Sequence, residues 1–163
     1  MKTRLSLLAL LLSVAGLAQN DTLPEMNQKI LAYAESKIGN KVGDGVCGTL
    51  VKEAILHADR KWEKKLKKGE LKNKNPYGRL IDAADALPGD IVVFKKCTFK
   101  DGLKTATSHV AIIQQSDYAD KGIFDVINQN DGAKKIKDSV VKERHLNIND
   151  IVAGKVFFYR YEK

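Results

Sequence analysis

The feature that most constrains this chain is a change in its hydrophobic pattern at Pro76. Before Pro76, apolar residues recur at helical spacing in two segments, residues 30–38 and 50–58. After Pro76, short apolar runs alternate with polar turns, which is typical of strands. Two helices followed by a run of strands predict one α+β domain, with helices packed on a mostly antiparallel sheet of about five strands.

The predicted strands can be placed from their flanking turns. Residues 87–90 read Leu-Pro-Gly-Asp, a turn sequence in which we expect Asp90 to bond the turn itself. The expected strands lie at residues 91–94, 109–113, within 122–130, more weakly at 139–144, and at 155–161.

The first 18 residues have the pattern of a signal peptide. Lys2 and Arg4 precede an apolar run over residues 5–17, and the small residues Gly16 and Ala18 suit a signal peptidase. The run is too short for a lasting transmembrane helix, so we expect no stable membrane anchor. Cleavage near Ala18 and Gln19 leaves residues 19–163 as a single domain, periplasmic or secreted. An uncleaved anchor or a buried N-terminal helix is the alternative.

The charge of the chain indicates an anionic partner. It has 28 Lys and Arg against 20 Asp and Glu, and loss of Lys2 and Arg4 leaves 26 against 20, a net charge of +6. A positive surface suits peptidoglycan or another anionic cell-wall polymer. The chain has no glycine-aromatic RNA motif and no zinc-ligand spacing, so we expect no nucleic-acid partner, metal or other cofactor. We expect a monomer.

Cys47 is the candidate nucleophile because it stands at the start of the second predicted helix. The free N–H groups and the positive dipole at a helix start stabilise a thiolate, which is the reactive form of cysteine. The same N–H groups can hold the oxyanion that forms after attack on a carbonyl. We expect Gly45 and Gly48 to keep this corner open to substrate. The alternative is a small buried core residue.

His109 is the candidate base, and a residue of the next strand is expected to orient it. His109 opens a predicted strand and shares a face with the small residue Ala111, which leaves space beside the imidazole. Asn128 is the first choice for the orienting residue, Asn130 the second and Gln129 the third. A hydrogen-bonded structural histidine is the alternative.

Four segments in this order resemble the CHAP and NlpC/P60 superfamily of papain-like cysteine peptidases and amidases. They are residues 43–50 around Cys47, 87–94, 108–113 with His109, and 126–130 with Asn128. The resemblance implies a papain-like fold, with Cys47 as nucleophile, His109 as base and Asn128 at the third polar position. Glu is common in that superfamily where Asn128 stands, and Gln is common where Val46 precedes the cysteine. The oxyanion donors are therefore expected to be mainly backbone groups.

Together these features predict an exported cysteine hydrolase that cleaves amide bonds, with peptidoglycan peptides as the substrate that the resemblance implies. Acyl transfer to an amine instead of water would use the same residues. The competing hypothesis is an inactive binding module of the same fold, because export favours disulfides and Cys47 could then pair with Cys97. Free thiols fit the enzyme, since a disulfide removes the thiolate.

Overall fold

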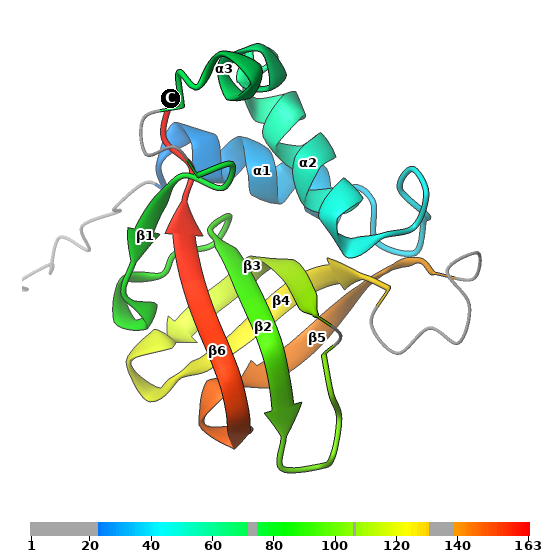
Figure 1. Ribbon diagram of the computed structural model, residues 1–163, viewed down its shortest axis with the longest axis vertical. Helices are drawn as coiled ribbons and strands as arrows, with labels where there is room; N and C mark the ends of the chain where they lie inside the picture. The colour runs from blue at the N-terminus through cyan, green and yellow to red at the C-terminus, as the bar shows by residue number, and fades with distance from the viewer. Residues whose placement is uncertain (1–22, 72–74, 106, 131–138) are drawn as a thin grey trace, which may run out of the picture.

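A computed structural model describes residues 23–71, 75–105, 107–130 and 139–163, so the predicted signal peptide, residues 1–18, lies outside the described residues. The described part is an α+β domain in which helices cover one face of an antiparallel sheet, as predicted (Figure 1). The described helices are α1 (Glu25–Glu35), α2 (Cys47–Ala58) and α3 (Trp62–Lys68). The described strands are β1 (Arg79–Ile81), β2 (Ile91–Phe99), β3 (Ser108–Tyr118), β4 (Ile123–Gln129), β5 (Val141–Asn147) and β6 (Ile151–Arg160).

The sheet has the strand order β1-β6-β2-β3-β4-β5, and each neighbouring pair is antiparallel. It curls strongly, so that β2 and β6 cross in front of β3, β4 and β5 in Figure 1. The ring centroids of Phe124 on β4 and Phe158 on β6 are 5.2 Å apart, although β2 and β3 separate those strands in the sheet. The sheet is therefore an incomplete barrel.

Two apolar clusters lie on the two faces of this curled sheet. Strand side chains alternate between faces, so Val93 and Ile112 pack with α1 and α2, whereas Val92 and Ala111 point into the curl. The helix-side cluster holds the fully buried Leu50 of α2, which fixes that helix against the sheet. Side chains on the same face of β3 as Ala111 therefore point to the inside of the curled sheet.

Strand β2 is longer than predicted because it continues through a bulge. Lys96 has φ of 50°, and the β2–β6 register shifts between Lys95 and Thr98. The partner strand accommodates the bulge with Gly154, where a Cβ would lie 2.6 Å from the Cα of Cys97. A bulge adds a residue and re-aims the side chains that follow it. It leaves Cys97 buried inside the curl.

Candidate active site

Cys47 is the first residue of α2, as the sequence predicts. Val46 is the N-cap residue, and no side chain among the described residues caps this helix start. The N–H groups of Cys47 and Gly48 therefore have no helical partner, whereas the N–H of Thr49 donates to the carbonyl of Val46 at 3.0 Å. A Cβ placed on Gly48 would meet no described atom within 4 Å, so space lies open beside these N–H groups. The half-buried thiol packs at the margin of the helix-side cluster.

The loop before Cys47 is held in one conformation by side-chain hydrogen bonds. The carboxylate Oδ1 of Asp44 accepts hydrogen bonds from the N–H of Val46 at 3.0 Å and from the hydroxyl of Thr49 at 2.6 Å. Gly45 is buried and has φ of 89°, a conformation that favours glycine. We predicted that Gly45 and Gly48 keep this corner open. The open space that the structure describes lies at Gly48, and the positive φ of Gly45 fits a turn of the chain.

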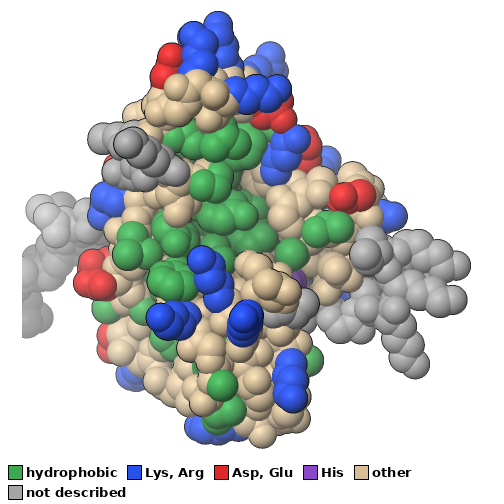
Figure 2. Space-filling model, in the orientation of Figure 1, with side chains coloured by type: hydrophobic (Ala, Val, Ile, Leu, Met, Phe, Trp, Pro, Cys, Tyr) green, Lys and Arg blue, Asp and Glu red, His purple; other side chains and the backbone are tan. Residues whose placement is uncertain are grey.

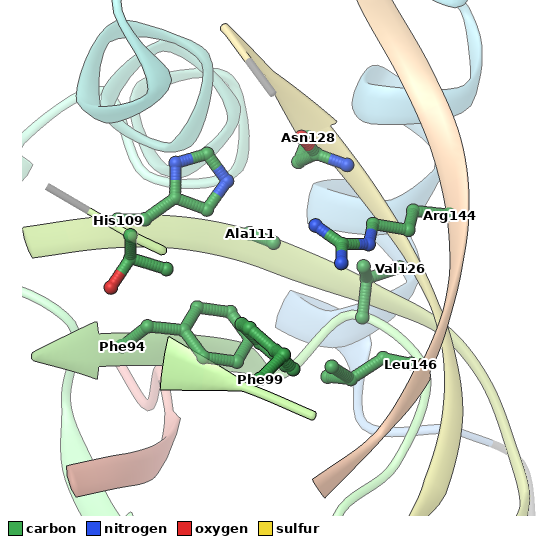
Figure 3. Close-up of a pocket in the computed structure, with 9 residues that line it drawn as sticks. Phe94, Phe99, His109, Ala111, Val126, Asn128, Arg144 and Leu146 are labelled. Carbon is green, nitrogen blue, oxygen red and sulfur yellow. The ribbon is translucent and has the colours of Figure 1, made fainter. Parts of the chain in front are cut away.

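His109 is the second residue of β3 and is half-buried. It pairs in register with Phe94 of β2, and the two ring centroids are 6.1 Å apart. It opens onto a small pocket lined by Phe94, Phe99, Thr105, His109, Ala111, Val126, Asn128, Arg144 and Leu146 (Figure 3). The free volume of the pocket is about 10 Å³, roughly the space that the centre of one water molecule needs. The pocket can orient the imidazole, but it is too small for a substrate.

Asn128 lies in the same pocket, and its side-chain oxygen is a hydrogen-bond acceptor. Its side chain is 1% exposed, and its Nδ2 donates a long hydrogen bond of 3.5 Å to the carbonyl of Lys142. Its Oδ1 is buried and has no hydrogen-bond partner among the described residues. Figure 3 shows Asn128 and His109 on the same side of the sheet, with Ala111 between them. A buried acceptor without a donor costs free energy, which a ring N–H in this pocket would offset.

The two alternatives to Asn128 have other positions. Asn130 follows β4 with φ of 65°, a left-handed conformation that asparagine tolerates at a turn. Gln129 is fully buried, and its side chain bonds Val42 and Val46, in the loop before Cys47. Of the three candidates, only Asn128 lines the pocket of His109.

The start of α2 meets the sheet at the end where β3 begins. Gln129 of β4 donates a hydrogen bond of 3.2 Å to the carbonyl of Val46, the residue before Cys47. Ile112 of β3 pairs with Ile127 of β4. If this antiparallel register is continued by two residues, Gln129 lies opposite Val110, the residue that follows His109. The lining of the small pocket does not include Cys47. Cys47 packs against the helix-side cluster, and His109 lines the small pocket with Asn128 (Figure 3).

Tyr77 also belongs to this region, and the sequence did not single it out as a site residue. Burial raises the pKa of the Tyr77 phenol, and the proximity of the Cys47 thiol and the Tyr159 phenol raises the pKa further. The ring centroids of Tyr77 and Tyr159 are 6.0 Å apart. The indole of Trp62 holds the Tyr77 turn by donating 2.9 Å to the carbonyl of Pro76. The signal in the sequence was the Pro-Tyr-Gly turn, but no periodicity connects it to a cysteine 30 residues earlier.

A larger groove lies next to this aromatic pair. It is lined by Asn75, Gly78, Arg79, Leu80, Phe157 and Tyr159, with a free volume of about 470 Å³. Leu80 is 59% exposed, and the ammonium of Lys95 lies 5.2 Å from the ring centroid of Phe157. Figure 2 shows hydrophobic side chains gathered on this face, with Lys and Arg around them. The groove is open enough to accept a chain segment.

Both cysteines are free thiols. Cys97 is buried inside the curl and its Sγ donates to the carbonyl of Lys155 at 3.3 Å, whereas Cys47 packs with the helices. The disulfide of the competing hypothesis is therefore not formed in this structure.

The other histidines lie outside the site. The ring centroids of His57 and Tyr33 are 5.2 Å apart, and Nδ1 of the exposed His145 is 2.9 Å from an Asp125 carboxylate oxygen. Within the described ranges, no three His, Cys, Asp or Glu side chains could jointly hold a metal ion. None of the helices that the structure describes has the length and apolarity to cross a membrane.

The fold and the site together define a papain-like domain of the cysteine peptidase type, with its cysteine at a helix start beside a curled antiparallel sheet. The family model of the AIM3/BBC1 cysteine proteinase-fold domain matches residues 21–162, so the chain belongs to that family. A solved structure, that of the wild-type endolysin LysIME-EF1, is similar with a TM-score of 0.51 and 18% identity. The match covers 83% of this chain and 65% of the endolysin chain, and at this identity it shows the fold alone. Comparison with curated proteins gives no significant match.

Proposed function

We propose that this domain is a cysteine hydrolase that cleaves amide bonds. Cys47 is its nucleophile, His109 its base and Asn128 the residue that orients the imidazole. The observation that carries the proposal is a free thiol at an uncapped helix start, beside the sheet end that holds His109 and Asn128 in one pocket. This combination supplies an activated thiol, a proton acceptor and oxyanion donors.

The reaction follows from the chemistry of these groups. His109 accepts the proton of the Cys47 thiol, and the thiolate attacks the carbonyl carbon of the amide. The N–H groups of Cys47 and Gly48 hold the oxyanion, since Val46 offers no side-chain donor. His109 then protonates the leaving amine, and water hydrolyses the thioester to release the acid and the thiol. In acyl transfer, an amine instead of water would attack the thioester in the last step.

The substrate that we propose is a peptidoglycan peptide. Three observations support it: the resemblance of the motifs to CHAP and NlpC/P60 proteins, the likeness in fold to an endolysin, and the net charge of +6 of residues 19–163, which have 26 Lys and Arg against 20 Asp and Glu. The groove of Phe157 and Tyr159 gives a peptide a place to lie beside Tyr77 and Cys47. Export through residues 1–18, which leaves the domain of residues 19–163 in the periplasm or outside the cell, is part of this proposal.

The test is digestion of purified peptidoglycan by the wild type, by Cys47→Ala and by Cys97→Ala. Mass spectrometry of the soluble products is expected to show new amine and carboxylate ends with the wild type and with Cys97→Ala, and none with Cys47→Ala. Equal products from wild type and Cys47→Ala would contradict the proposal. Binding to the polymer without products from any variant would instead indicate a binding module.

A further inference from the structure

We infer that Gln129 is a positioning residue of this site, which aims the backbone N–H of Cys47 by holding the carbonyl of Val46. The inference rests on the proposed cysteine hydrolase. It gives a role to a residue that the sequence pattern placed last among the candidates for orienting His109.

Gln129 uses its whole amide on the loop before the nucleophile. Its Oε1 accepts a hydrogen bond of 2.7 Å from the N–H of Val42. Its Nε2 donates to the carbonyl of Val42 at 3.0 Å and to the carbonyl of Val46 at 3.2 Å. The side chain is fully buried, so water does not compete for these bonds. One side chain thus closes the loop of residues 42–46 onto β4.

Val46 is consequently held at both of its backbone groups. Its N–H donates to Asp44 at 3.0 Å, and its carbonyl accepts from Gln129 and, at 3.0 Å, from the N–H of Thr49. The peptide group that joins Val46 to Cys47 is planar and trans, so its C=O and N–H point in opposite directions. Holding the carbonyl toward the protein therefore aims the N–H of Cys47 out of the helix start, where an oxyanion would form.

The chemistry of the position requires an amide. Two carbonyl oxygens face Nε2, and a carboxylate at this position could donate to neither of them when ionised. Because strand side chains alternate, adjacent residues of β4 serve the two halves of the site: Asn128 faces the pocket of His109 and Gln129 faces the loop of Cys47. A single strand thereby sets the base and the oxyanion donor relative to each other.

Gln129→Met tests the inference, because methionine has a similar length and makes none of these hydrogen bonds. The rate at which iodoacetamide alkylates Cys47, followed by peptide mass spectrometry, is expected to fall about two- to fivefold as the helix start loosens. On peptidoglycan, kcat is expected to fall on the order of tenfold to hundredfold, with KM little changed. Phe124→Leu is the control, since it lowers stability within the other cluster and should leave the alkylation rate unchanged.

A second pair of variants keeps the inference testable where Gln129→Met does not fold. Asp44 is exposed, so Asp44→Ala and Asp44→Asn should both fold, and both lose the same charge. Only Asn keeps an oxygen that can accept the N–H of Val46. Alkylation of Cys47 is expected to be slower in Asp44→Ala than in Asp44→Asn.

Wild-type alkylation rates in Gln129→Met, or equal rates in the two Asp44 variants, would overturn the inference. The alkylation assay needs no substrate, so its outcome is independent of the proposed function. Alkylation that depends on Gln129 in a protein that releases no peptidoglycan product would contradict the hydrolase alone.

Discussion

At the scale of single residues, Asn128 carries a conflict between stability and the proposed role. Its Oδ1 is buried without a partner among the described residues, and its Nδ2 makes one hydrogen bond of 3.5 Å. A polar group in that position stabilises the fold little, because burying it costs about as much as its bond returns. The proposed role, in which the amide oxygen accepts a ring N–H of His109, would account for a polar residue at this position.

Asn128→Leu is therefore expected to separate activity from stability. Leucine has a similar volume and removes the buried unpaired oxygen, so the melting temperature should stay the same or rise. Peptidoglycan hydrolysis should fall on the order of tenfold to hundredfold, because the imidazole loses its orienting acceptor. Calorimetry and product release measure the two quantities. A variant that melts several degrees lower and keeps full activity would show that Asn128 is structural.

The sequence predicted the position of Asn128 better than it predicted the contacts of Gln129 and Tyr77. Alternation along the strand places Asn128 on the face of His109 and Gln129 on the other face, and both placements are confirmed. Alternation cannot indicate which residues the other face of β4 contacts, because the partners of Gln129, Val46 and Val42, lie 83 and 87 residues earlier in the chain. Tyr77 was missed for the same reason: it reaches Cys47 through a turn and not through a periodic element.

At the scale of elements, α2 is fixed at its second end by the residue that follows it. Asp59 is 4% exposed and accepts hydrogen bonds from the ammonium of Lys65 at 2.6 Å and the phenol of Tyr161 at 2.8 Å. Its Oδ1 accepts from the N–H of Lys61 at 3.0 Å. Asp59 thus joins α2, α3 and the end of the chain, and it holds the helix whose first residue is Cys47.

This cluster predicts a stability change with pH. Burial by itself raises the pKa of Asp59, but the hydrogen bonds from Lys65, Lys61 and Tyr161 outweigh it, and the pKa is lowered overall. A carboxyl whose pKa is lower in the folded state stabilises the fold above its unfolded pKa of about 3.9. That contribution is lost as the pH falls through the lower folded value.

Asp59→Asn should therefore melt at a lower temperature than the wild type at pH 7, and the gap should narrow as the pH falls below about 4. Thermal unfolding of both proteins between pH 7 and pH 3 measures this gap. Lys29→Met, which breaks the exposed pair of Lys29 with Glu25, is a suitable comparison, because such a pair contributes little. A gap that stays constant or widens in acid would contradict the assignment.

Element boundaries were predicted less well than the elements themselves. The helical spacing of apolar residues continues to Ile38, but α1 ends at Glu35 and Ile38 forms a bridge with Val141 of β5. The short strand β1 was not predicted, because three residues show no periodicity. In both cases the conformation is set by a partner distant in the sequence, which a local pattern does not contain.

At the scale of the whole molecule, Asp90 joins the helix layer to the sheet. As predicted, it bonds its own turn: its Oδ2 accepts from the N–H of Leu87 at 2.8 Å. It also accepts from the amide of Asn27 on α1 at 2.7 Å and from Arg160 on β6 at 2.7 and 3.0 Å. The turn also packs closely against α1, since a Cβ on Gly89 would lie 2.3 Å from the carbonyl oxygen of Asn27.

Arg160→Met is expected to destabilise the whole domain, because it leaves the fully buried carboxylate of Asp90 without its cation. Removing one partner of a buried ion pair costs about 3–5 kcal/mol, which lowers the melting temperature of a domain of this size by roughly 6–20 °C. Arg79→Met is the matched control, because Arg79 pairs with Glu162 at the surface, and such pairs are worth about 1 kcal/mol or less. Thermal unfolding followed by circular dichroism compares the two. Equal melting temperatures would mean that the layers are held by the apolar clusters alone. The second measurement is the alkylation rate of Cys47 in Arg160→Met, taken below its melting temperature. A wild-type rate together with a lower melting temperature would show that the Asp90 cluster stabilises the domain, and that the reactivity of Cys47 depends on the loop that Gln129 holds.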